Sequence, residues 1–319
     1  LVDRVRFPEN SLRGIAVNQF QKTFDRSVHQ LRSLPLHQSA PIEVLLLESD
    51  PTVFLGRFCA AYTIGCDLFL GNPTWVETEL QQVFSLVKPD LIWTKAVDRL
   101  TDFSLKENAI DSRLNSSQLK ALDLDLTVRV PRRIMIPTGG SSGQIRFAIH
   151  TWDTLMASVK GFADYFQVDH INSFCILPLY HVSGLMQFLR SLTTAGQFWV
   201  RSSKTLEHWI ESSAFNPQLD RWFTSIVPTQ LQRLLNNESA IAWLAQFETV
   251  LLGGAPAWPA LLERARTHRI RLAPTYGMTE TASQVATLKP DDFLAGACSS
   301  GQVLPHAKLE IISPNIGES

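Results

Sequence analysis

Residues 276–281, with the sequence Tyr-Gly-Met-Thr-Glu-Thr, combine an aromatic ring, two hydroxyls and one carboxylate within six positions. They follow an apolar run at residues 270–274 that is typical of a strand ending in a turn, and ligands in open α/β sheets gather beyond the carboxyl ends of strands. Tyr276 can stack on a base, and Glu280 can hold Mg²⁺. The segment therefore predicts a nucleotide site; the alternative is a surface turn with a capping threonine, since Thr followed closely by Glu also starts helices.

A second segment, residues 136–146, has the sequence Ile-Pro-Thr-Gly-Gly-Ser-Ser-Gly-Gln-Ile-Arg. Its glycine amides and hydroxyls can surround an oxyanion without side-chain bulk, and Arg146 would add a fixed positive charge. It is not a Walker P-loop, which needs Gly-x-x-x-x-Gly-Lys-Ser/Thr, and residues 146–150 look extended instead of helical. The segment favours a phosphate loop, with a Gly/Ser-rich hairpin turn as the alternative.

In two shorter segments, a strand-like run is followed by residues that could contact a ligand. Residues 177–185, Leu-Pro-Leu-Tyr-His-Val-Ser-Gly-Leu, break at proline and present His181, which can line a pocket or orient a substrate. The alternative for His181 is a partly buried structural histidine. Residues 250–256, Val-Leu-Leu-Gly-Gly-Ala-Pro, end an apolar run in a glycine turn.

In this order, the four segments resemble the adenylate-forming superfamily, which includes acyl- and aryl-CoA ligases, firefly luciferases and the adenylation domains of peptide synthetases. The resemblance spans residues 134–284. It implies that an acid's carboxylate attacks the α-phosphate of ATP to give an acyl-adenylate and pyrophosphate, and that the thiol of CoA then displaces AMP. Residues 276–284 and 179–185 are most similar to the 2-succinylbenzoate–CoA ligases of menaquinone and phylloquinone biosynthesis.

The resemblance also implies a role for individual residues. The nucleotide and its phosphates would contact Thr138, Gly139, Gly140, Ser141, Ser142, Gly143, Gly253, Gly254, Ala255, Pro256, Tyr276 and Thr279. The acyl pocket would include His181, Gly277, Met278, Ser283 and Gln284. The catalytic residues would be Arg146, His181, Thr279 and Glu280, with Glu280 holding Mg²⁺.

The sequence departs from the superfamily pattern in two places. In the phosphate loop, the common Thr-Ser-Gly-Thr-Thr-Gly-x-Pro-Lys has become Thr-Gly-Gly-Ser-Ser-Gly-Gln-Ile-Arg, and Arg146 in place of Lys is not neutral, because a planar guanidinium and a compact ammonium address phosphate differently. The chain also stops at Ser319, where related enzymes continue through a ribose-binding aspartate, a hinge and a small C-terminal domain with a catalytic lysine. We expect weak adenylation and no efficient thioester formation from this chain alone.

Several alternatives stay open for the function. The acid could be benzoate, a hydroxycinnamate or an amino acid, although residues 221–224 contain no acidic group to meet an amino acid's ammonium. Arg190 and Arg221 are expected at solvated surface positions, and the alternative for each is that it attracts a second substrate carboxylate. The chain could also be a nucleotide- or acyl-binding module with little turnover. A Ser/His hydrolase is disfavoured because no Gly-x-Ser-x-Gly elbow accompanies His181.

The elements that must position these residues alternate between strands and helices. Strand-like runs lie at residues 42–48, 67–70, 91–94 and 222–227; helical patterns lie at 74–88, 228–235 and 257–267, and at the stripe Leu155, Val159, Phe162 and Phe166, which Thr151 can cap. This alternation predicts an α/β fold with mostly parallel sheets flanked by helices. We expect an N-terminal α/β subdomain at 1–130 and an ATP- and acyl-binding subdomain at 131–319, joined through a connecting segment at 104–131.

Composition limits the classes of partner. The 29 Lys and Arg residues balance 30 Asp and Glu residues, for a formal charge of −1, so neither a nucleic-acid surface nor a polybasic membrane patch is expected. The longest apolar runs fall far short of the ~20 residues that span a bilayer. Four scattered cysteines without Cys-x-x-Cys spacing indicate neither zinc nor a disulfide framework. The sequence predicts a soluble cytoplasmic protein that binds an aromatic acid, ATP and CoA, and that could form a homodimer.

Overall fold

The computed structural model describes residues 12–34, 41–95, 100, 110–111, 132–139, 143–212 and 220–312. These residues form a mixed α/β fold with two sheets, in which most neighbouring strands are parallel and helices flank the strands. This confirms the predicted fold class. Most of the connecting segment expected at 104–131 lies outside the described residues, as do the predicted site residues Gly140, Ser141 and Ser142.

The first sheet has six strands in the order β5-β4-β2-β3-β6-β7. Their bounds are β2 (Glu43–Leu47), β3 (Asp67–Gly71), β4 (Leu91–Thr94), β5 (Ile110–Asp111), β6 (Arg133–Gly139) and β7 (Ile145–Thr151). Strand β2 pairs in parallel with β3 and β4, whereas β6 and β7 form an antiparallel hairpin. The helices of this part are α1 (Val17–Ser33), α2 (Pro51–Ile64) and α3 (Glu77–Leu86), so the helix expected from residue 74 begins at Glu77.

The second sheet has eight strands in the order β1-β9-β8-β10-β11-β12-β13-β14. Their bounds are β1 (Leu12–Arg13), β8 (Asn172–Cys175), β9 (Phe198–Val200), β10 (Trp222–Ile226), β11 (Thr249–Leu252), β12 (Leu272–Met278), β13 (Ser283–Thr287) and β14 (Gln302–Val303). Pairing is parallel from β1 to β12 and antiparallel from β12 to β14. The helices are α4 (Trp152–Phe166), α5 (Val182–Thr193), α6 (Leu206–Ser212), α7 (Pro228–Leu234), α8 (Glu238–Leu244), α9 (Pro259–Thr267) and α10 (Pro290–Leu294).

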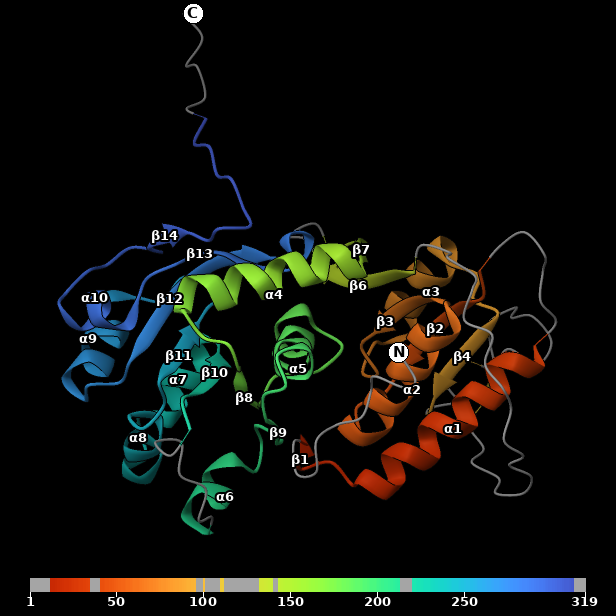
Figure 1. The fold of residues 1–319 in the computed structure, drawn as a ribbon, viewed down its shortest axis with the longest axis horizontal. Coiled ribbons are helices and arrows are strands. Elements are labelled where there is room, and N and C mark those ends of the chain that lie inside the picture. Colours follow the sequence, from red (N-terminus) through yellow and green to blue (C-terminus); the bar gives the residue numbers. More distant parts are fainter. Residues whose placement is uncertain are drawn as a thin grey trace, which may run out of the picture.

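Helix α4 follows the β6–β7 hairpin and runs toward β12 and β13 across the molecule (Figure 1). Thr151 caps it as predicted, because its hydroxyl accepts the backbone N–H of Thr154. The predicted stripe faces inward, and Phe162 is fully buried. Helix α4 thereby links the hairpin of the first sheet to the C-terminal strands of the second.

One large hydrophobic core is shared by the two sheets. It contains residues of β2, β3 and β6 from the first sheet and of β8 and β9 from the second, with α2 and α5 among them. Phe58 of α2 and Phe188 of α5 meet edge to face, with ring centroids 6.4 Å apart. A second core lies under α6 to α9, between those helices and strands β10 to β12.

The proposed division at residue 130 stays a prediction. The two sheets do not follow this division. Strand β1 precedes residue 130 but joins the second sheet, whereas β6 and β7 follow residue 130 but join the first. In the part of the chain that the structure describes, no helix is both long and apolar enough to cross a membrane.

Candidate active site

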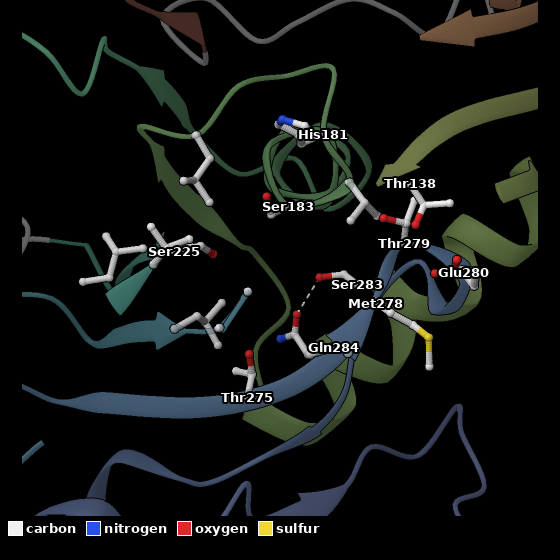
Figure 2. A pocket seen from close by; sticks show the side chains of 18 of the residues that line it. Thr138, His181, Ser183, Ser225, Thr275, Met278, Thr279, Glu280, Ser283 and Gln284 are labelled. Atoms are coloured by element: carbon white, nitrogen blue, oxygen red, sulfur yellow. Dashed lines mark hydrogen bonds between the residues drawn. The ribbon is translucent and has the colours of Figure 1, made fainter. Parts of the chain in front are cut away.

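A cavity of about 550 Å³ lies where the carboxyl ends of the second sheet's strands face the β6–β7 hairpin. Figure 2 shows Ser225 and Thr275 on one side of it and Thr138 and Thr279 on the other. The lining residues are Pro137, Thr138, Leu177, His181, Val182, Ser183, Ser225, Ile226, Val227, Leu251, Gly253, Gly254, Thr275, Gly277, Met278, Thr279, Glu280, Ser283 and Gln284. The four sequence segments therefore contribute to one cavity, at the place where open α/β sheets bind ligands.

The tyrosine-glycine segment is part of a strand, which corrects the prediction that the strand ends near residue 274. Strand β12 pairs in parallel with β11 as far as Pro274 and then antiparallel with β13 from Thr275 onward. The change of partner lets the strand continue through Met278, with an irregularity between Tyr276 and Gly277. Gly277 is required there because a Cβ would collide with the backbone of the facing strand.

The turn after β12 holds an unusual backbone conformation. A short 3₁₀ turn, η3 (Thr279–Thr281), is followed by Ala282 at φ 52° and Ser283 at φ 100°, both in the region that disfavours residues with a side chain. The Thr281 hydroxyl stabilises the turn, because it accepts the N–H of Met278 at 3.0 Å and lies 2.7 Å from the Ser283 carbonyl oxygen. Such strain persists where surrounding structure enforces it, and here it places Ser283 and Gln284 in the cavity wall.

The β6–β7 hairpin carries the segment predicted to bind phosphate. Thr138 lines the cavity, and Arg146 is its cross-strand partner, so the two side chains share one face of the hairpin. Gly139 ends β6, and Gly143 has φ 68°. Gln82 of α3 contacts the turn end of the hairpin, where β7 begins: its Oε1 accepts the N–H of Ile145 at 2.8 Å, and its Nε2 lies 3.5 Å from the Gly143 carbonyl. Sequence reasoning did not find Gln82.

His181 lines the cavity at the point where α5 begins. Burial lowers the pKa of its imidazole below the ordinary value, so the ring is neutral at pH 7. Its ring centroid lies 4.7 Å from that of Tyr180. A neutral imidazole here can donate or accept one hydrogen bond to a bound ligand without adding charge.

Arg190 of α5 is buried, which contradicts the expectation of a solvated surface position. Arg190 is 2% exposed, and its guanidinium lies over the Phe162 ring, 4.2 Å from the ring centroid. One nitrogen donates to Gln284 Oε1 at 2.8 Å and lies 3.3 Å from Ser283 Oγ. Burial lowers the pKa of Arg190 to about 9, so the group is still a cation at pH 7. The adjoining Nε is buried without a hydrogen-bond partner.

Arg221 behaves as the sequence predicted. It is half exposed and pairs with Glu248 at 3.1 Å on the surface. The two arginines therefore differ in their surroundings, and Arg190 alone of this pair adjoins the cavity wall.

Some of the residues that the sequence predicted for the site line the cavity, and others lie outside its lining. Those in the lining are Thr138, His181, Gly253, Gly254, Gly277, Met278, Thr279, Glu280, Ser283 and Gln284. Those outside the lining are Gly143, Arg146, Ala255, Pro256 and Tyr276, all exposed to solvent. Ser225, Ile226 and Val227 were missed, although they end a strand that the sequence predicted, and strand ends were the available signal.

Glu280 is an exposed carboxylate in the cavity lining. The described residues contain no group of three or more side chains that would form a protein-only metal site. Mg²⁺ is usually held by one or two carboxylates together with substrate phosphates and water. A single Glu280 in the same cavity as the hairpin that the sequence predicts to bind phosphate fits that pattern.

Comparison with known proteins places the chain in a family. The AMP-binding enzyme family matches residues 18–319, and the chain belongs to it. Among curated relatives, the 2-succinylbenzoate–CoA ligase of Listeria innocua is 28% identical over 273 residues, covering 84% of this chain and 56% of the relative. The enzyme of the same name from Escherichia coli is 34% identical over 183 residues, covering 57% and 37%. The chain thus spans about half the length of these relatives.

Solved structures share the fold. The o-succinylbenzoate CoA synthetase of Bacillus subtilis, in complex with the acyl-adenylate intermediate OSB-AMP, has a TM-score of 0.72 at 19% identity, with 95% of this chain and 80% of that chain covered. The N-terminal domain of FACL13 from Mycobacterium tuberculosis has a TM-score of 0.71 at 17% identity, with 90% and 75% covered.

Proposed function

We propose that this chain forms the ATP- and acid-binding part of an AMP-forming acid–CoA ligase that activates 2-succinylbenzoate, in menaquinone or phylloquinone biosynthesis. The observation that carries the proposal is a single cavity lined by the β6–β7 hairpin, the glycine turn at 253–254 and the carboxylate of Glu280. Behind Gln284 in the wall of this cavity lies the buried Arg190. The names of the curated relatives support the choice of acid.

The cavity supplies groups for adenylate formation. Thr138, the neighbouring glycine amides and Arg146 would bind the leaving phosphates, and Thr279 would contact the α-phosphate that the acid's carboxylate attacks. Mg²⁺ held by Glu280 would offset phosphate charge. The turn at Gly253 and Gly254 would lie beside the adenine. Positioning and electrostatics dominate phosphoryl chemistry, so these fixed groups are the part of catalysis that this chain provides.

Other residues of the cavity lining suit an aromatic acid. Leu177, Val227 and Leu251 are apolar, while Ser225, Ser283 and Gln284 are polar. Pockets for small molecules typically combine apolar walls with a few placed polar groups. An aromatic ring would contact the apolar side chains, with its reactive carboxylate directed toward Thr279. Displacement of AMP by CoA would complete the ligase reaction in the second step.

Arg190 supports a dicarboxylic acid over a monocarboxylic one. It is a buried cation, it contacts two residues of the cavity wall, and its Nε has no partner. Burying an isolated charge is costly unless a partner compensates it. The second carboxylate of succinylbenzoate would bind beside Ser283 and Gln284, which Arg190 contacts. Its negative charge would there compensate the buried positive charge of Arg190.

The test compares two non-hydrolysable adenylate mimics, succinylbenzoyl and benzoyl, by calorimetric titration of the wild type and of Arg190→Gln, with Arg221→Gln as the matched surface control. We expect the wild type and Arg221→Gln to prefer the succinylbenzoyl mimic by at least about tenfold, which is ~1.4 kcal/mol. Arg190→Gln should lose most of that preference and keep its affinity for the benzoyl mimic. Equal wild-type affinities would reject the dicarboxylic substrate, and absence of binding to both mimics would reject the proposed function for this chain.

A further inference from the structure

Three side chains on β7 and α4 contact backbone carbonyls at three positions along the segment that contains η3 and β13. His150 Nε2 lies 2.7 Å from the Thr279 carbonyl oxygen, and Ser158 Oγ donates to the Ala282 carbonyl at 2.8 Å. Farther along α4, the Tyr165 hydroxyl donates to the Thr287 carbonyl. These donors form a row that begins beside the cavity and moves away from it along α4.

His150 is the member of this row that belongs to the β6–β7 hairpin itself. It is 3% exposed and lies on β7 four residues after Arg146, paired with Ile134 of β6. A carbonyl oxygen can only accept, so Nε2 must carry the proton in this contact. The other ring nitrogen lies 3.4 Å from the Thr154 hydroxyl. The imidazole thus connects the hairpin of the first sheet to the turn at Thr279, 129 positions later in the chain.

We propose that His150 is a positioning residue, which fixes Thr279 and Glu280 relative to the phosphate-binding hairpin. The inference rests on the proposed function, because it assigns Thr279 to the α-phosphate and Glu280 to Mg²⁺. The backbone of this turn is strained, with Ala282 and Ser283 at positive φ, so its position depends on outside contacts. Without the donor of His150, the turn would relax away from the hairpin, and phosphate contacts that need both sides would weaken.

The experiment uses a matched pair of amides. His150→Gln can place an amide N–H where Nε2 lies, whereas the shorter His150→Asn cannot reach the Thr279 carbonyl. Tyr165→Phe is the control, because it removes a donor of the same row far from the phosphates and keeps the ring. Dissociation constants are measured for adenosine, for AMP and for ATP with Mg²⁺, and thermal unfolding is recorded for each variant.

We expect His150→Asn to bind AMP and Mg²⁺-ATP about tenfold more weakly than the wild type, with adenosine affinity within about twofold. His150→Gln should recover to within about threefold, and Tyr165→Phe should lower the melting temperature while leaving all three affinities unchanged. Equal weakening of adenosine and ATP in His150→Asn would show a general structural role and overturn the proposal. Loss of phosphate affinity in His150→Gln equal to that in His150→Asn would also overturn it.

A ligand-free measurement separates this inference from the proposed function. Hydrogen exchange of peptides covering residues 279–284 should accelerate in His150→Asn and stay at the wild-type rate in His150→Gln. Unchanged exchange in His150→Asn would refute the positioning role even if the wild type bound no nucleotide. Failure of wild-type binding with the expected exchange pattern would instead reject the proposed function alone.

Discussion

His306 is a partly buried histidine that packs against helix α4 near Arg190. His306 packs against Gly161 of α4, where no room is left for a Cβ. Both of its ring nitrogens are buried without a hydrogen-bond partner. Burial lowers the pKa of His306, and the nearby charge of Arg190 lowers it further. The folded protein therefore holds His306 neutral, next to a cation that would repel its protonated form.

This arrangement predicts that acid destabilises the protein in part through His306. The pKa of His306 is lower in the folded than in the unfolded state, so below about pH 6.5 the unfolded state binds more protons. The stability contributed by neutral His306 is present above that pH and is lost as the pH falls. We expect the free energy of unfolding to decrease from pH 7 to pH 5, and to decrease less in His306→Asn.

Urea unfolding at a series of pH values measures this difference, with the exposed His268→Asn as the control. The control should follow the wild-type pH profile. Identical slopes for the wild type and His306→Asn would show that other groups carry the acid sensitivity.

At the scale of elements, helix α2 shows how a buried helix begins at a defined residue. Asp50 caps it, because its carboxylate accepts the N–H groups of Thr52 at 2.9 Å and Val53 at 3.1 Å, and Pro51 occupies the first helical position. Proline is favoured there because its missing N–H would have no partner within the helix. The helix ends at Ile64 and is followed by Gly65, whose φ of 89° suits a residue without a Cβ.

Removing the cap should therefore cost stability without affecting the cavity. We expect Asp50→Ala to lower the free energy of unfolding by about 1 kcal/mol, because two backbone N–H groups lose their acceptor. Asp50→Ser should keep most of the stability, since serine is also a good cap. Denaturant titration checks both variants, and equal loss in both would mean that the charge of Asp50, near Lys95 at 4.0 Å, matters more than the cap.

At the scale of the whole molecule, we expect the shared core to make the two sheets one cooperative unit. Phe58 and Phe188 meet within it from α2 and α5. The cavity also takes Thr138 from the first sheet and most of its other lining from elements of the second. The geometry of the site thus depends on packing between the sheets.

Truncating the aromatic contact tests this cooperativity. Phe58→Ala should lower the free energy of unfolding by about 3–5 kcal/mol, as large core truncations do. Hydrogen exchange should then accelerate in peptides from β2 and also from β11. Phe84→Ala is the control, because Phe84 is a partly buried residue of α3 that packs against a separate core cluster, and this change should affect the first sheet more strongly. Acceleration confined to the first sheet in Phe58→Ala would contradict a shared cooperative core.

Local signals in the sequence were sufficient for many elements, and they identified four segments that contribute to one cavity. Short strand-like runs predicted β2, β3, β4 and β10, and an apolar stripe with its capping threonine predicted α4. The same approach missed α2, whose residues from Thr52 to Thr63 are all buried. A helix that is apolar on every side has no 3.6-residue pattern to detect.

The sequence by itself determined which residue types could bind a nucleotide and an acid, because glycines, hydroxyls and a carboxylate in fixed local order have chemistry that does not depend on distant contacts. Only the tertiary structure decided how they combine. In the tertiary structure β12 pairs first with β11 and then with β13, so the strand continues through Met278. Arg190 is buried, and the sequence could not distinguish it from a surface arginine. The tertiary structure also brought His150 to Thr279. Strand partners, burial and contacts between distant residues arise from packing between elements, and no local pattern records them.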